Sequence, residues 1–328
     1  MSGIERIVFF CRIADPELLE LLDFYREDIA LAHELADEVV VCTSLSQLRS
    51  QPGLLWAWWH APSSPAVLGW RLLGRPSVVT GAVDLTNPTE TGPKHVLKRW
   101  LTWVSARSAT LNLAISEYEA RDLRSLAKGA RIDTLFPCVD TEFLTIGEPA
   151  DTPTFLTVAQ VNPASIHRKG LDRVVELFMA VRQQHPGASL TIAGPIAAAG
   201  QVWIDGQQAA GRLDGVTFAG RVSREHKREL MQQAWYYLQP SRYEGFGLAV
   251  AEAMACGAVP IVTCVGSLPE VVGGAGRVIE WPASAEPLYR PTPAERGRAR
   301  EQVERFSARE RGASVRRSLR TVGLLGVD

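Results

Sequence analysis

Short apolar runs alternate with longer segments of helical periodicity along the whole chain. The apolar runs predict strands near residues 7–10, 38–42, 54–59, 77–80, 111–115, 132–137, 154–161, 189–193, 216–218, 235–239 and 259–262. The segments between them predict helices near 20–36, 66–73, 93–109, 171–184, 223–234, 292–306 and 308–322. Because strands and helices take turns in this way, the pattern predicts parallel sheets covered by helices on both faces.

The alternation is interrupted by a polar, proline-rich segment at 147–153 and then starts again. A length of 328 residues also favours two domains of ordinary size. We therefore predict an α/β protein of two Rossmann-like domains that face each other across a cleft. The N-terminal domain would span 1–148 and the C-terminal domain 149–328, with a final helix that could pack back on the first. Ligands of such sheets bind beyond the carboxyl ends of the strands.

The most informative segment is a glycine-containing turn at 240–247, which joins a predicted strand to a helix that ends at Gly257. Its glycines would let the backbone approach a ligand closely, and the first N–H groups of the helix would be free to bind a phosphate. Glu244 lies on this turn, where its carboxylate could accept hydrogen bonds from sugar hydroxyls. The alternative is that Glu244 only caps a plain strand-to-helix turn. The residues expected to surround the ligand here are Glu244, Gly245, Phe246, Gly247, Leu248 and Ala249.

Charged residues on either side of this turn would complete a site for a nucleotide sugar. Glu252 lies on an apolar helix, where a ribose diol would pair with its carboxylate; the alternative partner is an internal salt bridge. Arg168 and Lys169 precede a helix, and basic side chains there oppose the helix dipole unless an anion binds. Lys169 could therefore neutralise a diphosphate, whereas the alternative is a solvated surface pair.

Composition and charge argue against nucleic-acid binding, a cysteine metal site and a membrane-spanning protein. The formal net charge of −1 gives no electrostatic case for nucleic-acid binding. The five cysteines are scattered and form no cluster with histidine, which favours buried reduced thiols over a metal site or disulfides. The first residues lack the layout of a signal peptide, and no apolar run approaches the roughly 20 residues of a membrane-spanning helix. We therefore expect a cytoplasmic protein, at most attached to the inner face of a membrane; the oligomeric state stays open.

One predicted helix, around residues 94–103, mixes basic and aromatic residues and could make a weak peripheral contact with an anionic membrane. We favour the simpler interpretation, in which an amphipathic helix covers the core and keeps its basic face in solvent.

Five short motifs follow one another in the second half of the chain. They are Lys169-Gly170, Ala193-Gly194, Gly220-Arg221-Val222, the turn from Pro240 to Glu252, and the segment 269–273. Their order and spacing resemble the second domain of retaining, family-4-like glycosyltransferases of the GT-B fold, also described as glycosyl transferases group 1. The resemblance covers about residues 130–285.

This resemblance implies transfer of a sugar from a nucleoside-diphosphate sugar, of the UDP or GDP type, to a hydroxyl acceptor with retention of configuration. The reaction would need no metal and no cofactor besides the donor itself. By the same resemblance, Glu244 would contact the sugar hydroxyls, Glu252 the ribose and Lys169 the diphosphate. The backbone near Arg221 and Val222 would meet the base.

The chain also departs from the family pattern in its second half. The family usually has Gly-Arg where this chain has Ala159-Gln160, so the usual diphosphate-binding arginine is missing. Arg168 or Arg242 could take its place.

The first half resembles the family less closely. The stretches at 56–60 and 78–84 resemble a subgroup of these enzymes, and by that resemblance Asp84 or His60 could help to position the reacting sugar. The alternative for His60 is an ordinary loop histidine. Two other functions stay open: a sugar-nucleotide epimerase or hydrolase of the same fold, and a catalytically silent protein that binds a nucleotide.

Overall fold

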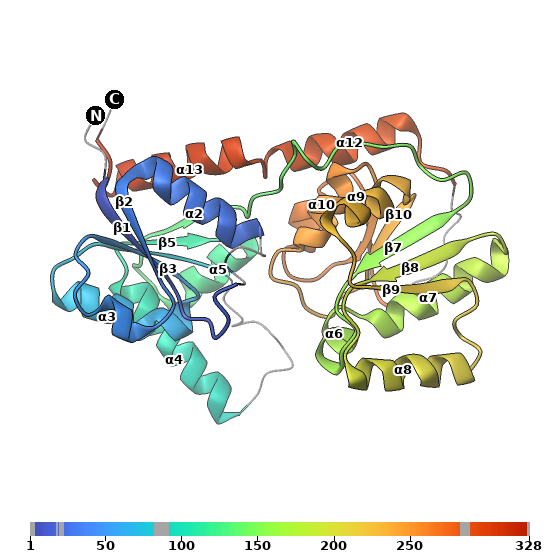
Figure 1. Cartoon of the computed structure of the whole chain (residues 1–328), viewed down its shortest axis with the longest axis horizontal. Helices are drawn as coiled ribbons and strands as arrows, with labels where there is room; N and C mark the ends of the chain where they lie inside the picture. Colours follow the sequence, from blue (N-terminus) through green and yellow to red (C-terminus); the bar gives the residue numbers. More distant parts are fainter. Residues whose placement is uncertain (1–3, 18, 20–22, 82–91, 283–288, 327–328) are drawn as a thin grey trace. The chain divides into compact units, whose positions relative to one another are not determined.

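A computed structural model of the chain describes residues 4–17, 19, 23–81, 92–282 and 289–326 (Figure 1). Contacts between residues divide the chain into two units. Unit 1 comprises Met1–Cys138 together with Phe306–Asp328, and unit 2 comprises Val139–Arg305.

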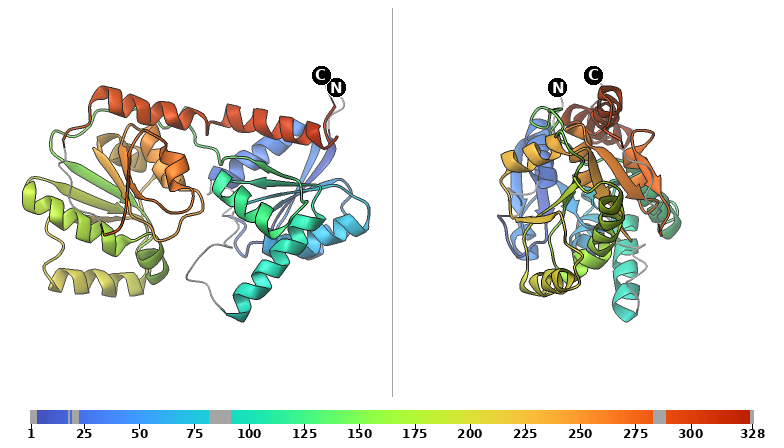
Figure 2. Two further views of the ribbon diagram at one scale, coloured as in Figure 1. Left: turned by 180° about the vertical axis from the view of Figure 1, so that it is seen from behind. Right: turned by 90° about the vertical axis from the view of Figure 1, so that its right-hand side faces the viewer.

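Unit 1 contains a parallel sheet with helices on both faces (Figure 2). Its described strands are β1 (Ile4–Cys11), β2 (Ala36–Cys42), β3 (Leu54–Trp58), β4 (Ser77–Thr80), β5 (Leu111–Ala114) and β6 (Ile132–Thr134). They lie in the order β2-β1-β3-β4-β5-β6. Its described helices are α2 (Asp23–Leu35), η1 (Leu45–Leu48), α3 (His60–Leu72), α4 (Pro93–Ser108), α5 (Glu117–Leu126) and α13 (Ala308–Thr321).

Unit 2 repeats this architecture. Its described strands are β7 (Thr154–Val158), β8 (Ser189–Ala193), β9 (Val216–Gly220), β10 (Tyr236–Gln239), β11 (Val259–Thr263) and β12 (Arg277–Ile279). They form a second parallel sheet in the order β12-β11-β10-β7-β8-β9. Its described helices are α6 (Pro163–Arg168), α7 (Leu171–Gln184), α8 (Ala198–Ala209), α9 (Arg224–Gln233), α10 (Leu248–Ala255), α11 (Leu268–Val272) and α12 (Pro293–Glu304).

The strand order reverses within each sheet. In unit 1 the chain runs from β1 to β2 on one side and then places β3 on the other side of β1. In unit 2 it runs outward from β7 through β8 and β9, and then returns to place β10 on the opposite side of β7. At such switch points the connections leave to opposite sides, and ligands of open α/β sheets bind at the carboxyl ends of the strands there.

Each unit has a core of its own. Phe9 packs against Trp56 in unit 1, and Phe155 packs against Phe178 in unit 2. All residues of β3 and β11 are buried, as expected for strands covered on both faces. The expectation of buried thiols holds for four of the five cysteines, whereas Cys264, just after β11, is exposed.

The boundary between the units lies near residue 138, whereas the sequence places it near 148. Two arginines of α12 account for the difference. Arg300 Nη2 donates a hydrogen bond to the carbonyl of Thr141 at 2.5 Å, and Arg296 Nη2 donates to the carbonyl of Gly147 at 2.8 Å. The segment up to the predicted linker is therefore bound along unit 2.

A buried ion pair makes α13 part of unit 1. Arg311 Nε donates to Asp28 Oδ1 at 2.6 Å, and its Nη2 donates to Asp28 Oδ2 at 2.8 Å. The two side chains are only 2% and 0% exposed. Arg311 Nη1 also donates to the carbonyl of Leu135 at 3.3 Å. This bidentate pair fixes α13 against α2, which carries Asp28.

The prediction that α4 covers the core with its apolar side is wrong. The residues that α4 buries are small or polar: Thr102, Ser105 and Ala106. The large apolar residues that it exposes are Val96, Leu97, Trp100 and Trp103. In the ranges described above, no helix is long and apolar enough to cross a membrane.

Arg311→Met would leave the Asp28 carboxylate buried without its partner. We expect the free energy of unfolding, measured by chemical denaturation, to fall by about 3–5 kcal/mol. The matched control is Arg316→Met on the same helix, since Arg316 pairs with Glu34 at the surface (side chains 37% and 63% exposed). That change should lower stability by less than about 1 kcal/mol. Equal effects of the two substitutions would show that the buried pair does not fix α13.

Candidate functional site

Two turns leave the same edge of the unit 2 sheet at its switch point. The first follows β7 and leads through α6 to Lys169, and the second follows β10 and runs from Pro240 to Gly247. β7 and β10 are paired in parallel, with Phe155 opposite Tyr236. Parallel pairing places the carboxyl ends of both strands together, so the two turns can share one site.

The turn after β7 contains the short helix α6, which is absent from the helices that the sequence predicts. Asn162 caps this helix by accepting the N–H of Ser165 at 2.8 Å, and Pro163 is its first residue. Gly170 follows with a φ of 71°, and a Cβ atom there would lie 2.3 Å from the carbonyl oxygen of Pro240. Only glycine permits this approach, which holds the two turns against each other.

Arg242 also joins the two turns. Its Nη1 and Nη2 donate to the carboxylate of Asp172 on α7 at 2.8 and 2.6 Å. Its Nη1 donates as well to the carbonyl of His167 at 2.9 Å, and its backbone N–H donates to the carbonyl of Arg168 at 2.8 Å. Of the two arginines that the sequence offers as replacements, Arg242 is thus already bound to structural partners.

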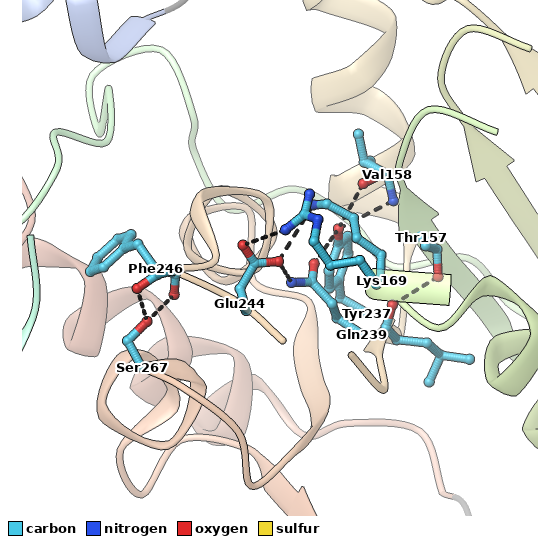
Figure 3. Close-up of polar contacts among 11 residues, drawn as sticks. Thr157, Val158, Lys169, Tyr237, Gln239, Glu244, Phe246 and Ser267 are labelled. Carbon is cyan, nitrogen blue, oxygen red and sulfur yellow. Dashed lines mark hydrogen bonds and ion pairs between the residues drawn. The ribbon is translucent and has the colours of Figure 1, made fainter. Parts of the chain in front are cut away.

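Glu244 occupies the centre of this arrangement (Figure 3). It is 8% exposed, and its Oε2 accepts a hydrogen bond of 2.7 Å from Gln239 Nε2. Arg168 Nη1 lies 3.4 Å from Glu244 Oε1, and Lys169 Nζ lies 3.7 Å from Glu244 Oε2. The side chains of Arg168 and Lys169 remain 38% and 18% exposed, so both cations can still reach a second anion. The structure thus brings together three residues that the sequence selects separately.

Gln239 is a site residue that the sequence analysis does not single out. Its side chain is 1% exposed and, besides holding Glu244, it accepts a hydrogen bond from the Tyr237 hydroxyl at 3.3 Å. That hydroxyl accepts the N–H of Val158 at 3.2 Å, and burial raises the pKa of Tyr237. A chain of hydrogen bonds therefore runs from β7 to Glu244 and fixes the carboxylate. The sequence signal that could have identified Gln239 is an amide residue at the end of an otherwise apolar strand.

The helix that follows the turn begins with free backbone donors. Gly247 precedes α10 with a φ of 98°. N–H groups in the first turn of a helix have no carbonyl partner in that helix, so those of Leu248 and Ala249 are suited to meet an anion. These are the donors that the sequence predicts at this place.

Residues after β11 support the turn. A Cβ atom at Gly266 would lie 2.0 Å from the carbonyl oxygen of Glu244, so the two backbones are in contact. Ser267 Oγ lies 2.7 Å from the carbonyl oxygen of Gly245 and 2.9 Å from that of Phe246, and its single O–H can donate to either. The turn is therefore held on the side of β11 as well as on the side of β7.

Glu252, further along α10, forms an ion pair with a residue of α9. Lys227 Nζ lies 3.0 Å from Glu252 Oε1, and their side chains are 23% and 14% exposed. This is the internal salt bridge that the sequence analysis keeps as the alternative to a ribose contact. Lys227 itself gives no distinct signal in the sequence because α9 contains several other charged residues.

Arg221 and Val222 follow β9, at the edge of the same sheet, and precede α9. Arg221 is exposed and Val222 is half-buried. Within the described part of unit 2, no hydrogen bond or ion pair links them to Glu244. Their contact with a base therefore stays a prediction.

The two candidates in the first half are placed differently. Asp84 lies outside the described residues. His60 is the first residue of α3 and is 2% exposed, and its Nδ1 lies 3.3 Å from Ser105 Oγ of α4. Burial lowers the pKa of His60 to about 3, so the ring is neutral at pH 7. His60 is thus packed inside unit 1 between two helices.

The second half of the chain matches a known protein family. Residues 140–287 match the family described as glycosyl transferases group 1. The gpi3 subunit of phosphatidylinositol N-acetylglucosaminyltransferase from Schizosaccharomyces pombe is 33% identical over 121 residues, which are 36% of this chain and 25% of that protein. The GDP-mannose:cellobiosyl-diphosphopolyprenol alpha-mannosyltransferase of Xanthomonas oryzae is 30% identical over 171 residues, 52% of this chain and 44% of that protein. The chain therefore spans less than half the length of these curated relatives.

Solved structures share the fold over nearly the whole chain. The Anabaena protein Alr3699/HepE, in complex with UDP and glucose, matches with a TM-score of 0.73 at 17% identity, over 97% of this chain and 100% of that one. Together with the two parallel sheets, this likeness confirms the α/β, GT-B fold class that the sequence predicts.

The buried neutral state of His60 predicts a specific pH dependence. The folded protein holds the pKa near 3, below the usual 6.5 of the unfolded chain, so protons favour the unfolded state as the pH falls below 6.5. Between pH 7 and pH 5 this residue should lower the free energy of unfolding by about 2 kcal/mol. The stability difference between the unchanged protein and His60→Gln, measured by denaturation at both pH values, should shift by that amount. A constant difference would mean that the folded protein does not perturb His60.

Proposed function

We propose that this protein transfers a sugar from a nucleoside-diphosphate sugar to a hydroxyl acceptor, because residues 140–287 match the glycosyl transferases group 1 family. The observation that supports this most is the contact of Glu244 with Arg168 and Lys169 at the switch point of unit 2. One carboxylate, two cations and a helix N-terminus lie within the short turns after β7 and β10. A donor sugar with a diphosphate needs each of these groups.

The charges of the site would let Arg168 and Lys169 exchange the carboxylate of Glu244 for a bound diphosphate. Glu244 balances one of the two cations, which leaves a net positive charge beside the first N–H groups of α10. An incoming diphosphate would compete for Arg168 and Lys169 and bring more negative charge than the carboxylate does. Glu244, still held by Gln239, would then be available to accept hydrogen bonds from the sugar hydroxyls.

We propose that the transfer retains the configuration of the sugar. The bond between the anomeric carbon and the leaving phosphate oxygen breaks, and a bond from that carbon to the acceptor oxygen forms on the same face. The proton of the acceptor hydroxyl passes to the leaving phosphate oxygen. Arg168, Lys169 and the N-terminus of α10 stabilise the charge that develops on the diphosphate, so the proposal needs no metal.

The names of the relatives suggest which donors and acceptors to consider. The name of the Xanthomonas enzyme gives GDP-mannose as its donor, and Anabaena HepE binds UDP. The relatives' names give phosphatidylinositol in one case and a diphosphopolyprenol-linked sugar in the other. For this chain we propose a UDP- or GDP-sugar, an acceptor hydroxyl and a cytoplasmic location.

Glu244→Ala separates orientation of the sugar from binding of the diphosphate. We expect the rate of sugar transfer to fall at least ~100-fold, because the hydroxyls lose their acceptor. The Kd for UDP or GDP, measured by isothermal titration, should stay equal or decrease, because the competing carboxylate is gone. Glu229→Gln, at an exposed site on α9, is the control and should leave both quantities unchanged. Unchanged transfer by Glu244→Ala would show that the site is assigned wrongly.

A second pair of variants tests whether Arg168 or Arg242 takes the role of the missing family arginine. We expect Arg168→Met to raise the Kd for the nucleoside diphosphate about tenfold or more, since it removes a charge-assisted contact. Arg242→Met should lower thermal stability, because Asp172 loses its partner. It should raise the Kd for the nucleoside diphosphate much less than Arg168→Met does. The reverse ranking of the two Kd values would assign the role to Arg242. Tight nucleotide binding without transfer to any acceptor would favour a catalytically silent protein, and release of free sugar would favour a hydrolase.

A further inference from the structure

Helix α4 of unit 1 is amphipathic, but its apolar side faces solvent and its small and polar residues face the protein. Val96, Trp100 and Trp103 recur at intervals of four and three residues, so they share one side of the helix. They are 65%, 56% and 43% exposed, and Leu97, on the same side, is 55% exposed. The side that α4 turns to the protein carries Thr102, Ser105 and Ala106. A helix that only covers a core has the opposite arrangement.

The charges on α4 all have one sign. From Pro93 to Ser108 the helix contains Lys94, Lys98, Arg99 and Arg107 and no acidic residue, in a chain whose formal net charge is −1. At 100° per residue, Lys94 and Arg99 lie on opposite flanks of the apolar stripe. Both are exposed. The stripe is therefore bordered by cations on both sides.

The N-terminal half of α4 extends away from the other helices of unit 1 (Figures 1 and 2). The residues that α4 buries lie in its C-terminal half. There Ser105 meets His60, and the backbone carbonyl of Arg107 accepts a hydrogen bond from Arg71 Nη1. Val96, Leu97 and Trp100 thus belong to the half of α4 that projects from the unit.

We propose that α4 docks on the interface of a bilayer that contains anionic lipids. Tryptophan side chains favour the depth of the headgroups, and basic residues that flank an apolar stripe pair with lipid phosphates. The stripe from Val96 to Trp103 is only about 10 Å long. The cations on both flanks of the stripe favour an anionic bilayer as its partner. The stripe is large enough for an interfacial helix that lies in the plane of the membrane.

The proposal goes beyond the proposed function and is tested separately from it. It assigns an orientation to unit 1, with the N-terminal half of α4 at the membrane surface. An acceptor that is itself carried by a lipid would then be presented to the protein at that surface.

Cosedimentation of the full chain with vesicles tests the proposal. Vesicles of phosphatidylcholine with phosphatidylglycerol should bind the protein, and vesicles of phosphatidylcholine alone should bind it more weakly. Added salt should reduce binding to the anionic vesicles, because it screens the basic flanks. Absence of binding to both kinds of vesicle would overturn the proposal.

Matched variants locate the contact on α4. The double substitution Leu97→Ser with Trp100→Ser should lower the partition coefficient for anionic vesicles ~tenfold or more, and Arg99→Glu should also lower it. Both sites are exposed, so the fold should persist, as thermal melting can check. The control is Val202→Ser, which removes an even more exposed apolar side chain (71%) from α8 in unit 2 and should have no effect.

Three outcomes distinguish this proposal from its rivals. Vesicle binding that survives the double substitution would overturn it. Self-association that the double substitution abolishes, without any vesicle binding, would show instead that the stripe contacts a second copy of the chain. Loss of vesicle binding with an unchanged Kd for UDP would support membrane docking independently of the donor site.

Discussion

The reversal of strand order between β7 and β10 is the constraint on which the site depends. It brings the turns after two strands, far apart in the chain, to the same edge of one sheet. The glycine at position 170 and the ion pair between Arg242 and Asp172 then hold these turns in contact. Glu244 is fixed by this arrangement rather than by its own turn alone, because its carboxylate is bound from β10 through Gln239 and from the β7 side through Arg168 and Lys169.

The chain uses arginine for two different structural tasks outside the site. Arg296 and Arg300 bind backbone carbonyls and so attach the segment 141–147 to unit 2. Arg311 instead forms a buried bidentate pair that makes the C-terminal helix part of unit 1. Planar guanidinium groups with several donors suit both tasks. Arg107 of α4 likewise donates to a backbone carbonyl, that of Lys128. Lys94 and Arg99 are exposed on the two flanks of the apolar stripe, and this arrangement points to an anionic surface outside the protein.

Much of this could be predicted from the sequence, and the exceptions have physical causes. The alternation of apolar runs and helices predicts the two parallel sheets, because buried strands must be apolar throughout. The turn with Glu244 is predicted because closely spaced glycines indicate a place where the backbone turns tightly and can approach a ligand. Gln239 is not predicted because an amide at the end of a strand does not show that its side chain is buried and turned to Glu244. Lys227 is not predicted because its partner Glu252 is distant in the sequence. The orientation of α4 is predicted wrongly because periodicity shows that a helix has an apolar side but not which side faces the protein.

The central claim is that Glu244, Arg168 and Lys169 form the receptor for the sugar diphosphate. A crystal structure of the chain soaked with UDP or GDP tests it most directly. The account predicts phosphate density between Arg168, Lys169 and the first N–H groups of α10, with the hydrogen bond from Gln239 to Glu244 intact. Nucleotide bound elsewhere on the protein, with these three residues unchanged, would contradict it.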